Sequence, residues 1–207
     1  MNKQEDKKAS LPIMNDIVII SAISNDEYQE YLDVLCDNLP SIGQKFIKKN
    51  PDFVRELFDN LLKPESFYCT IRERKTFRFC GYCGIKDIRV SKPELAIELI
   101  KSMQHKGIGT HAMKLLLQAH VPQNNFEYYR CVVATDNSSS QHLCEKIGGV
   151  PNGIVALVLK DPKLQEIFEE NNLDMIDDQL RLVADKFKVE PRKLLSHFLE
   201  YKICPES

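Results

Sequence analysis

The stretch "QHKGIGTHAMKLLLQAH", residues 104–120, begins with two closely spaced glycines and continues into an amphipathic helical pattern. The first amides of a helix have no acceptors within the helix, and the helix dipole adds positive potential there. Glycine lets a phosphate approach the backbone closely. The stretch therefore predicts a helix start near Gly107 and Gly109 that is built to hold an anion.

Two nucleotide-binding patterns fit this stretch poorly. A Walker A loop needs Gly-x-x-x-x-Gly-Lys-Ser/Thr, which is absent. The dinucleotide fingerprint needs a third glycine, but Ala112 stands three positions after Gly109, and the preceding strand is expected in a meander rather than a βαβ unit. A purely structural role for the two glycines stays open at this point.

The rest of the chain predicts an α+β protein with the order β-α-α-β-β-β-α-β-α-β. The gaps 74–75 and 89–92 suit hairpins, which favours an antiparallel meander. Residues 1–14 are expected to be a flexible leader, and 161–202 to form two or three helices with no strand. The strands are expected at 16–23, 66–73, 76–88, 93–100, 128–136 and 153–160, and the helices between them at 24–39, 50–63, up to about 120, and 138–148.

Composition excludes several classes of protein. The chain is 43% hydrophobic and 28% charged, with a net charge of −2 and no lysine- and arginine-rich stripe, so nucleic acid and membranes are not expected partners. The N-terminus lacks the apolar region of a signal peptide, and no apolar run approaches the roughly 20 residues that span a bilayer. Seven cysteines without a secretion signal indicate reduced thiols and a cytoplasmic protein.

Two segments resemble the GNAT N-acetyltransferase superfamily. Gln104-His105-Lys106-Gly107-Ile108-Gly109 matches Gln/Arg-x-x-Gly-x-Gly/Ala, that family's acetyl-CoA pyrophosphate motif. About 30 residues on, "TDNSSSQHLCEKIGG" resembles its Asn-x-x-Ser…Glu-Lys-hydrophobic-Gly segment, and the expected element order is also the family's. The segments "FCGYCGIKDI" and "PELAIELIKSMQHKGIG" look most like the branch of ribosomal-protein N-terminal (RimJ/RimL-type) acetyltransferases. That branch usually has a Gly-aromatic pair where this chain has Ala96-Ile97.

The resemblance implies a GNAT fold, with a mixed, mostly antiparallel central sheet and helices on both faces. It implies a catalytic domain over residues 1–160 and a helical C-terminal extension over 161–207. It also implies transfer of an acetyl group from acetyl-CoA, the cosubstrate, to a primary amine on a protein N-terminus or a small molecule. The residues that would bind acetyl-CoA are Leu99, Ile100, Gln104, His105, Lys106, Gly107, Ile108, Gly109, Thr110, Asn137 and Ser140.

For Asn137 and Ser140 a second interpretation is capping of the helix at 138–148, and Lys106 and His105 could equally be solvated surface residues. A strand amide near Ile100 is the expected donor to the thioester oxyanion.

Glu94 and Glu98 are the candidate bases for the attacking amine. With the period of two of a strand, both lie on one face with Ala96 and Ile100. Glutamate is uncommon in strands, so two on one face suggest a functional role. A solvent-facing stripe on a half-exposed sheet would also explain them. We expect Glu98 to be the base because it is nearer the point where the thioester would lie.

The general acid is harder to assign, because many family members carry a tyrosine where this chain has Cys144. A thiol could donate a proton, or Cys144 could be a small buried hydrophobe. Cys80 and Cys83 are spaced by three in a strand with no second ligand pair, so no metal site is expected.

Two further interpretations stay open. The missing tyrosine would also fit a GNAT-fold acyl-CoA-binding or regulatory module that has lost catalysis. Seven acids against one lysine in 161–178 would fit an interaction surface, or a solvated helix face. The C-terminal helices could shape the acceptor cleft or form a homodimer contact. Deletion of 161–207 would separate an enzyme, which should keep CoA binding, from an interaction module, which should lose its partner.

Overall fold

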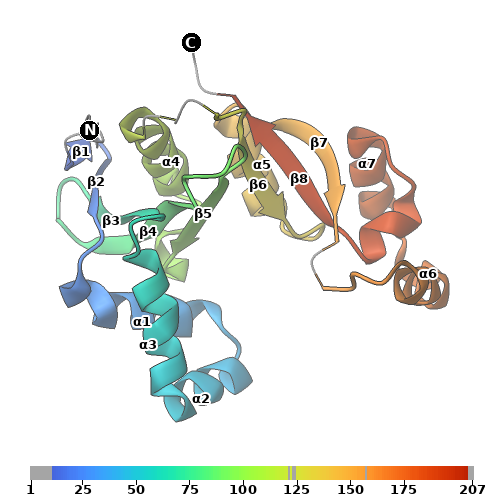
Figure 1. The fold of residues 1–207 in the computed structure, drawn as a ribbon, viewed down its shortest axis with the longest axis horizontal. Helices are drawn as coiled ribbons and strands as arrows, with labels where there is room; N and C mark the ends of the chain where they lie inside the picture. Colours follow the sequence, from blue (N-terminus) through green and yellow to red (C-terminus); the bar gives the residue numbers. More distant parts are fainter. Residues whose placement is uncertain (1–10, 121, 123–124, 157, 205–207) are drawn as a thin grey trace, which may run out of the picture. The chain divides into compact units, whose positions relative to one another are not determined.

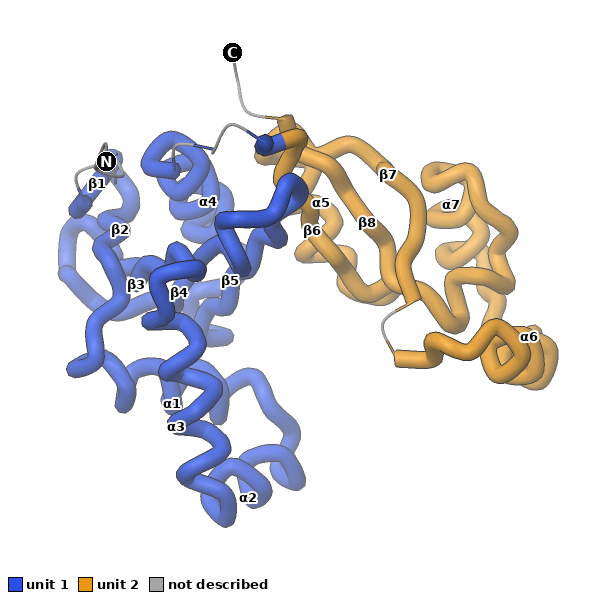
Figure 2. The backbone as a smooth tube through the Cα atoms, viewed as in Figure 1, with its two compact units in different colours: residues 1–126 blue, residues 127–207 orange. Residues whose placement is uncertain are grey.

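The computed structural model describes residues 11–120, 122, 125–156 and 158–204. It separates into two compact units, residues 1–126 and 127–207 (Figure 2). None of the helices in the described part of the chain combines the length and the apolar character needed to cross a membrane.

The first unit is built on an antiparallel meander, in which strands that are consecutive in sequence are neighbours in the sheet (Figure 1). The meander expected over the strands at 66–73, 76–88 and 93–100 is therefore confirmed. The strands are β1 (Ile13–Met14), β2 (Val18–Ala22), β3 (Phe67–Glu73), β4 (Phe79–Lys86) and β5 (Glu94–Leu99). The helices are α1 (Tyr28–Asn38), α2 (Ser41–Lys49), α3 (Pro51–Leu61) and α4 (Ile108–Ala119).

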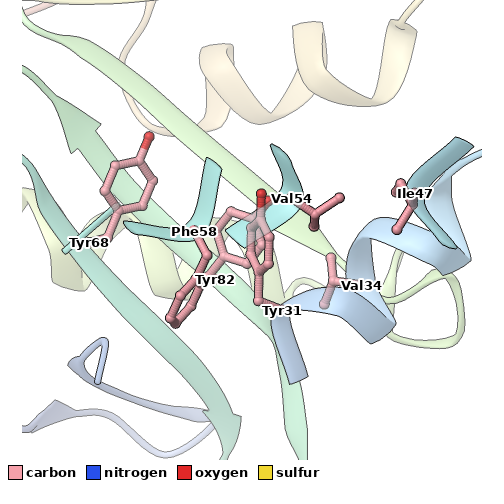
Figure 3. Packing of buried hydrophobic residues seen from close by; sticks show 7 residues of the cluster. All are labelled: Tyr31, Val34, Ile47, Val54, Phe58, Tyr68 and Tyr82. Atoms are coloured by element: carbon pink, nitrogen blue, oxygen red, sulfur yellow. The ribbon is translucent and has the colours of Figure 1, made fainter. Parts of the chain in front are cut away.

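Helices cover both faces of this meander. On one face Tyr68 of β3 and Tyr82 of β4 pack with Tyr31 of α1 and Phe58 of α3 (Figure 3). On the other face α4 packs against β2 and β4, and His120, the C-cap residue that follows α4, lies against Phe67 of β3. The α+β class and the expected helices on both faces are confirmed.

Two expectations for the first unit need correction. Ser41–Lys49 forms a helix that was not predicted, so three helices and not two separate β2 from β3. Gly43 sits inside it, and Pro40 precedes it as the N-cap. The leader was expected to be flexible over 1–14, but Ile13 and Met14 pair with Ile20 and Ile19 of β2. Residues 1–10 lie outside the described residues.

In the second unit a strand from the end of the chain lies between two earlier strands. β8 (Phe198–Ile203) pairs antiparallel with both β6 (Tyr129–Val133) and β7 (Val150–Val155). The helices are α5 (Ser138–Lys146), α6 (Pro162–Asn171) and α7 (Asp178–Phe187).

The expectation of no strand after residue 160 is therefore wrong. Leu199, Tyr201 and Ile203 are buried and the residues between them are half-buried, which is the period-two pattern of a strand. Deletion of 161–207 would remove the strand that joins β6 to β7, so it cannot test the helices alone. The division into a domain at 1–160 and an extension at 161–207 stays a prediction.

Candidate active site

The glycine segment starts α4 as predicted. Gly107 is the N-cap and has φ 78°, a left-handed conformation that favours glycine, and no side chain caps this end. The first hydrogen bond of the helix runs from the His111 amide to the Gly107 carbonyl, 3.1 Å. The amides of Ile108, Gly109 and Thr110 thus precede the first intrahelical bond, which is the arrangement that receives an anion.

The side chain of Gln104 holds the segment that leads into this helix. Its Nε2 donates to the carbonyl of Leu99, 3.1 Å, and to Oδ1 of Asn38, 3.2 Å. The Asn38 Nδ2 donates to the same Leu99 carbonyl, 3.0 Å, and Asp37 accepts from the Lys101 amide. Gln104 therefore fixes the loop to the end of β5 and α1, while His105 and Lys106 are exposed.

The strand amide expected near Ile100 is not that of Ile100 itself. This amide donates to the carbonyl of Cys80 on β4, 2.9 Å, so it is already paired within the sheet. Successive residues of a strand direct their amides to opposite edges, so the amide of Leu99 faces away from β4. The Leu99 amide, which points away from β4, is therefore the strand amide near Ile100 that fits the expected role.

Glu98 is half-buried on β5 directly opposite Tyr82 of β4. Burial raises the pKa of the Glu98 carboxyl, and a hydrogen bond from the Tyr82 hydroxyl and the charge of Lys86 oppose that rise without cancelling it. Burial and then the charge of Glu98 raise the pKa of Tyr31 to about 12, and burial followed by the charges of Glu94 and Glu98 raises the pKa of Tyr68. The charge of Glu98 thus contributes to the raised pKa of Tyr31, Tyr68 and Tyr82, which are drawn in Figure 3.

Glu94 lies at the start of β5 in a different environment. It is opposite Lys86 at the end of β4, and the Lys86 ammonium donates to its carboxylate. The side chain of Lys86 is 55% exposed and that of Glu94 is 27% exposed. The pKa of Glu98 is thus raised, and Glu94 forms an ion pair with Lys86.

The remaining predicted residues lie in the second unit. Asn137 is the N-cap of α5, and its Oδ1 accepts from the Ser140 amide, 3.0 Å, so the capping interpretation is realised. Cys144 is only 4% exposed and is close enough to contribute to the raised pKa of Tyr201. This burial favours a packing role for the thiol.

The cysteine pair of β4 is also internal. Cys80 and Cys83 are fully buried, and burial raises the pKa of both thiols, that of Cys83 the more. Among the described residues no group of three His, Cys, Asp or Glu side chains could hold a metal ion.

Sequence reasoning missed two groups that define the site. Tyr82 was visible only as part of "GYCG", and its pairing with Glu98 depends on the register of β4 and β5. Asn38 ends α1 and reaches Leu99 across 61 positions of sequence, for which the sequence carries no signal.

Comparisons with known proteins give the family and the fold that the chain is similar to. The model of the Acetyltransferase (GNAT) domain family matches residues 18–150, which is more than half of the chain. No curated protein matches the chain by sequence.

Three similar solved structures have the same fold at low identity. Spermidine/spermine N-acetyltransferase SpeG from Vibrio cholerae is 14% identical with a TM-score of 0.57, covering 92% of this chain and 94% of its own. The microcin C7 self-immunity acetyltransferase MccE, solved with acetyl-CoA and AMP, is 14% identical with a TM-score of 0.59, covering 92% and 94%. RimL, the ribosomal L7/L12 α-N-protein acetyltransferase solved with CoA, is 11% identical with a TM-score of 0.59, covering 72% and 89%. At these identities the likeness shows the fold alone.

Proposed function

The chain belongs to the GNAT acetyltransferase family, and from this premise we propose that it transfers the acetyl group of acetyl-CoA to a primary amine. The observation that carries the proposal is the pairing of two features within the first unit. The start of α4 offers unpaired helix amides for a pyrophosphate, and β5, five residues upstream of the loop, carries a half-buried carboxylate with a raised pKa. Solved relatives contain CoA or acetyl-CoA, which supports the choice of donor.

The segment from Gln104 to Thr110 would hold the pyrophosphate of acetyl-CoA. The hydrogen bonds from Gln104 to Leu99 and Asn38 fix the loop before the ligand arrives, so little ordering is needed on binding. Gly107 takes the left-handed turn that directs the following amides to one side. Lys106 is exposed beside them and can add a positive charge.

Glu98 is the proposed general base. An amine attacks a thioester only as the free base, so the carboxylate of Glu98 accepts a proton from the ammonium group of the acceptor, directly or through water. The amine nitrogen then forms a bond to the acetyl carbon and becomes positively charged. As the carbon–sulfur bond breaks and CoA leaves as a thiolate, the nitrogen loses this second proton to water, so the products are the neutral amide and CoA. A raised pKa brings the carboxyl closer to the range where such proton transfer is efficient.

The oxyanion that develops on the thioester needs a hydrogen-bond donor. We assign the Leu99 amide, since the Ile100 amide is used by Cys80. A thiol such as that of cysteine has a modest pKa of about 8.5. The CoA thiolate is a similarly weak base, so water can protonate it as it leaves and a dedicated acid is not required. Asn137, Ser140 and Cys144 stay candidates for the CoA and acid roles predicted from the family.

Glu98→Gln tests the assignment, with Glu94→Gln as the matched control on the same face of β5. With an accepted amine, we expect Glu98→Gln to lower kcat by about 100-fold or more while the Kd of acetyl-CoA stays unchanged. Glu94→Gln should retain most of the activity. Release of CoA thiol and calorimetric binding of acetyl-CoA measure the two quantities. Full turnover by Glu98→Gln at neutral pH would refute the base assignment.

The alternative is a module that binds acyl-CoA without catalysis, which the buried Cys144 in place of the family tyrosine favours. Acetyl-CoA binding with no thiol release across peptides, polyamines, aminoglycosides and amino acids would support that alternative. Absence of acetyl-CoA binding would refute both.

A further inference from the structure

Helix α6 buries polar side chains and exposes apolar ones. Gln165 is 9% exposed and Glu169 is 0% exposed. Leu164, Ile167 and Phe168 are 55%, 54% and 39% exposed, and they stand at positions i, i+3 and i+4, so they form one stripe on the helix surface. A surface helix normally turns such a stripe toward the core. The reversed orientation of α6 therefore needs a cause.

The buried polar side chains fix that orientation. The Glu169 carboxylate accepts from the Lys193 ammonium, 2.8 Å, and from the Ser196 hydroxyl, 2.6 Å. The Gln165 side-chain amide donates to the carbonyl of Leu159. A rotation of α6 that buried the apolar stripe would break these hydrogen bonds, and lost hydrogen bonds of buried groups are costly. The stripe is thus held outward, as expected of a surface that a partner covers.

The surface around this stripe is acidic. Two more exposed apolar residues, Leu173 and Met175, follow directly after α6. Between residues 161 and 178 the exposed cation is Lys163. The exposed acids in the same range are Asp161, Glu166, Glu170, Asp174, Asp177 and Asp178. We call the exposed apolar and acidic side chains of residues 161–178 the α6 patch.

A second exposed apolar surface lies on α2 and α3 of the first unit (Figure 1). Ile42 and Phe46 stand one turn apart on α2 and are 75% and 53% exposed. Phe53 and Leu57 stand one turn apart on α3 and are also exposed. The rings of Phe46 and Phe53 are in contact, with centroids 5.7 Å apart. The four side chains therefore form one surface, which we call the α2 patch.

The charge on the α2 part of this patch is positive. Lys45 and Lys49 stand three and seven positions after Ile42, so they lie on the same side of the helix as Ile42 and Phe46. Lys48 adds a third cation, and Ser41–Lys49 contains no acid, while α3 carries charges of both signs. The three lysines are exposed, and none of them has an ion-pair partner among the described residues.

We propose that the α2 patch of one copy of this chain binds the α6 patch of a second copy, and that two copies exchange this contact reciprocally to form a dimer. Both patches expose apolar side chains, and the charges beside them differ in sign, so the contact covers both apolar surfaces and brings lysines to carboxylates. Either patch paired with itself would place like charges opposite each other. Reciprocal exchange forms the contact twice and closes the assembly at two copies. The proposal does not depend on the acetyltransferase activity.

Charge reversal tests the proposal in the full-length protein by sedimentation velocity over a series of concentrations. The unchanged protein should show a monomer–dimer equilibrium. Lys45→Glu with Lys49→Glu, and separately Glu170→Lys with Asp174→Lys, should each raise the dimer Kd by about tenfold or more. An equimolar mixture of the two variants should associate again, to within about threefold of the unchanged Kd, because opposite charges then meet at both contacts. Damage to the fold of a variant would not be repaired by mixing.

The control is Arg74→Glu with Lys75→Glu, the same change of net charge in the exposed turn between β3 and β4. It should dimerise as the unchanged protein does, and the thermal transition of each variant checks that it is folded. An unchanged protein that is monomeric at every concentration would overturn the proposal, and so would association that charge reversal does not weaken. Folded variants whose mixture stays monomeric would also overturn it. A monomer that binds phosphatidylserine vesicles would assign the α2 patch to an anionic membrane surface instead.

Discussion

Glu98 shows how one residue acquires its chemistry from the partner across a strand. The Glu98 carboxylate is partly dehydrated on β5, which disfavours its charged form. The Tyr82 hydroxyl donates a hydrogen bond to it, and this partly offsets the effect of burial. Burial also raises the pKa of Tyr82, so that hydroxyl keeps its proton and remains a donor. Tyr82 is therefore a positioning residue that holds the proposed base in one place and favours its ionised form.

Tyr82→Phe should shift the pH dependence of turnover. The hydrogen bond lowers the pKa of Glu98, so its removal raises that pKa further, and a higher pH is needed to keep the carboxylate ionised. We expect the acid limb of the kcat profile to move to higher pH while the acetyl-CoA Kd is unchanged. The control is Tyr68→Phe, which removes a hydroxyl of the same cluster that has no hydrogen bond to Glu98 in the described part of the chain. An acid limb that stays in place in Tyr82→Phe would show that the hydroxyl does not act on the base.

At the scale of elements, sequence patterns located α4 and the meander but not every strand. α4 was predictable because apolar spacing and the glycines both mark it, and β3 and β4 because short runs of apolar and aromatic residues are separated by a gap of hairpin length. The helix α2 was missed next to Pro40, and β8 was read as helix although Leu199, Tyr201 and Ile203 alternate. Whether such a short run is a strand depends on β6 and β7, which flank it and lie far away in sequence.

The site was predictable to the same extent. The residue types at the start of α4 and the face that Glu94 and Glu98 share follow from local spacing. The use of the Ile100 amide by Cys80, the pairing of Tyr82 with Glu98 and the reach of Asn38 to Leu99 require the register of the sheet. Register is decided by packing between distant segments, so it cannot be derived from local patterns in a single sequence.

Helix α6 is fastened to the segment before β8 by a buried carboxylate. Glu169 is 0% exposed and accepts from the Lys193 ammonium, 2.8 Å, and the Ser196 hydroxyl, 2.6 Å. Burial raises the pKa of Glu169, but these hydrogen bonds, with the charges of Lys193 and His197, outweigh it and lower the pKa below the usual value. The ionised form is thus the one that the folded state favours.

Glu169→Gln should therefore destabilise the protein in a pH-dependent way. A depressed pKa contributes stability above the ordinary pKa of about 4.3, and that contribution is lost as the pH falls. We expect a loss of about 2 kcal/mol in the free energy of unfolding at pH 7 and a smaller loss at pH 3, measured by urea denaturation. Glu170→Gln, an exposed change on the same helix, should have little effect at either pH. An equal loss at both pH values in Glu169→Gln would show that packing and not charge is responsible.

At the scale of the whole molecule, binding of the cosubstrate adds to stability wherever it contacts the folded state. The proposed pyrophosphate loop lies in the first unit, and its conformation depends on Gly107 at φ 78°. Acetyl-CoA at about 100 times its Kd should stabilise the protein by about 2.7 kcal/mol. Calorimetry should show this as a rise of several degrees in Tm, with slower amide hydrogen exchange at residues 107–110.

Gly107→Ala should remove most of the stabilisation by acetyl-CoA. The left-handed conformation is unfavourable for alanine, so the amides that follow residue 107 would change direction. The matched control is Gly148→Ala in the second unit, where φ is 89° and an added Cβ would meet nothing within 4 Å. Both changes should lower the Tm of the free protein by a similar amount, since each costs about 1 kcal/mol of backbone strain. Only Gly107→Ala should also raise the acetyl-CoA Kd. If both variants respond to acetyl-CoA as the unchanged protein does, the start of α4 is not where the pyrophosphate binds, and the match of Gln104–Gly109 to the family motif would not mark a binding site in this chain.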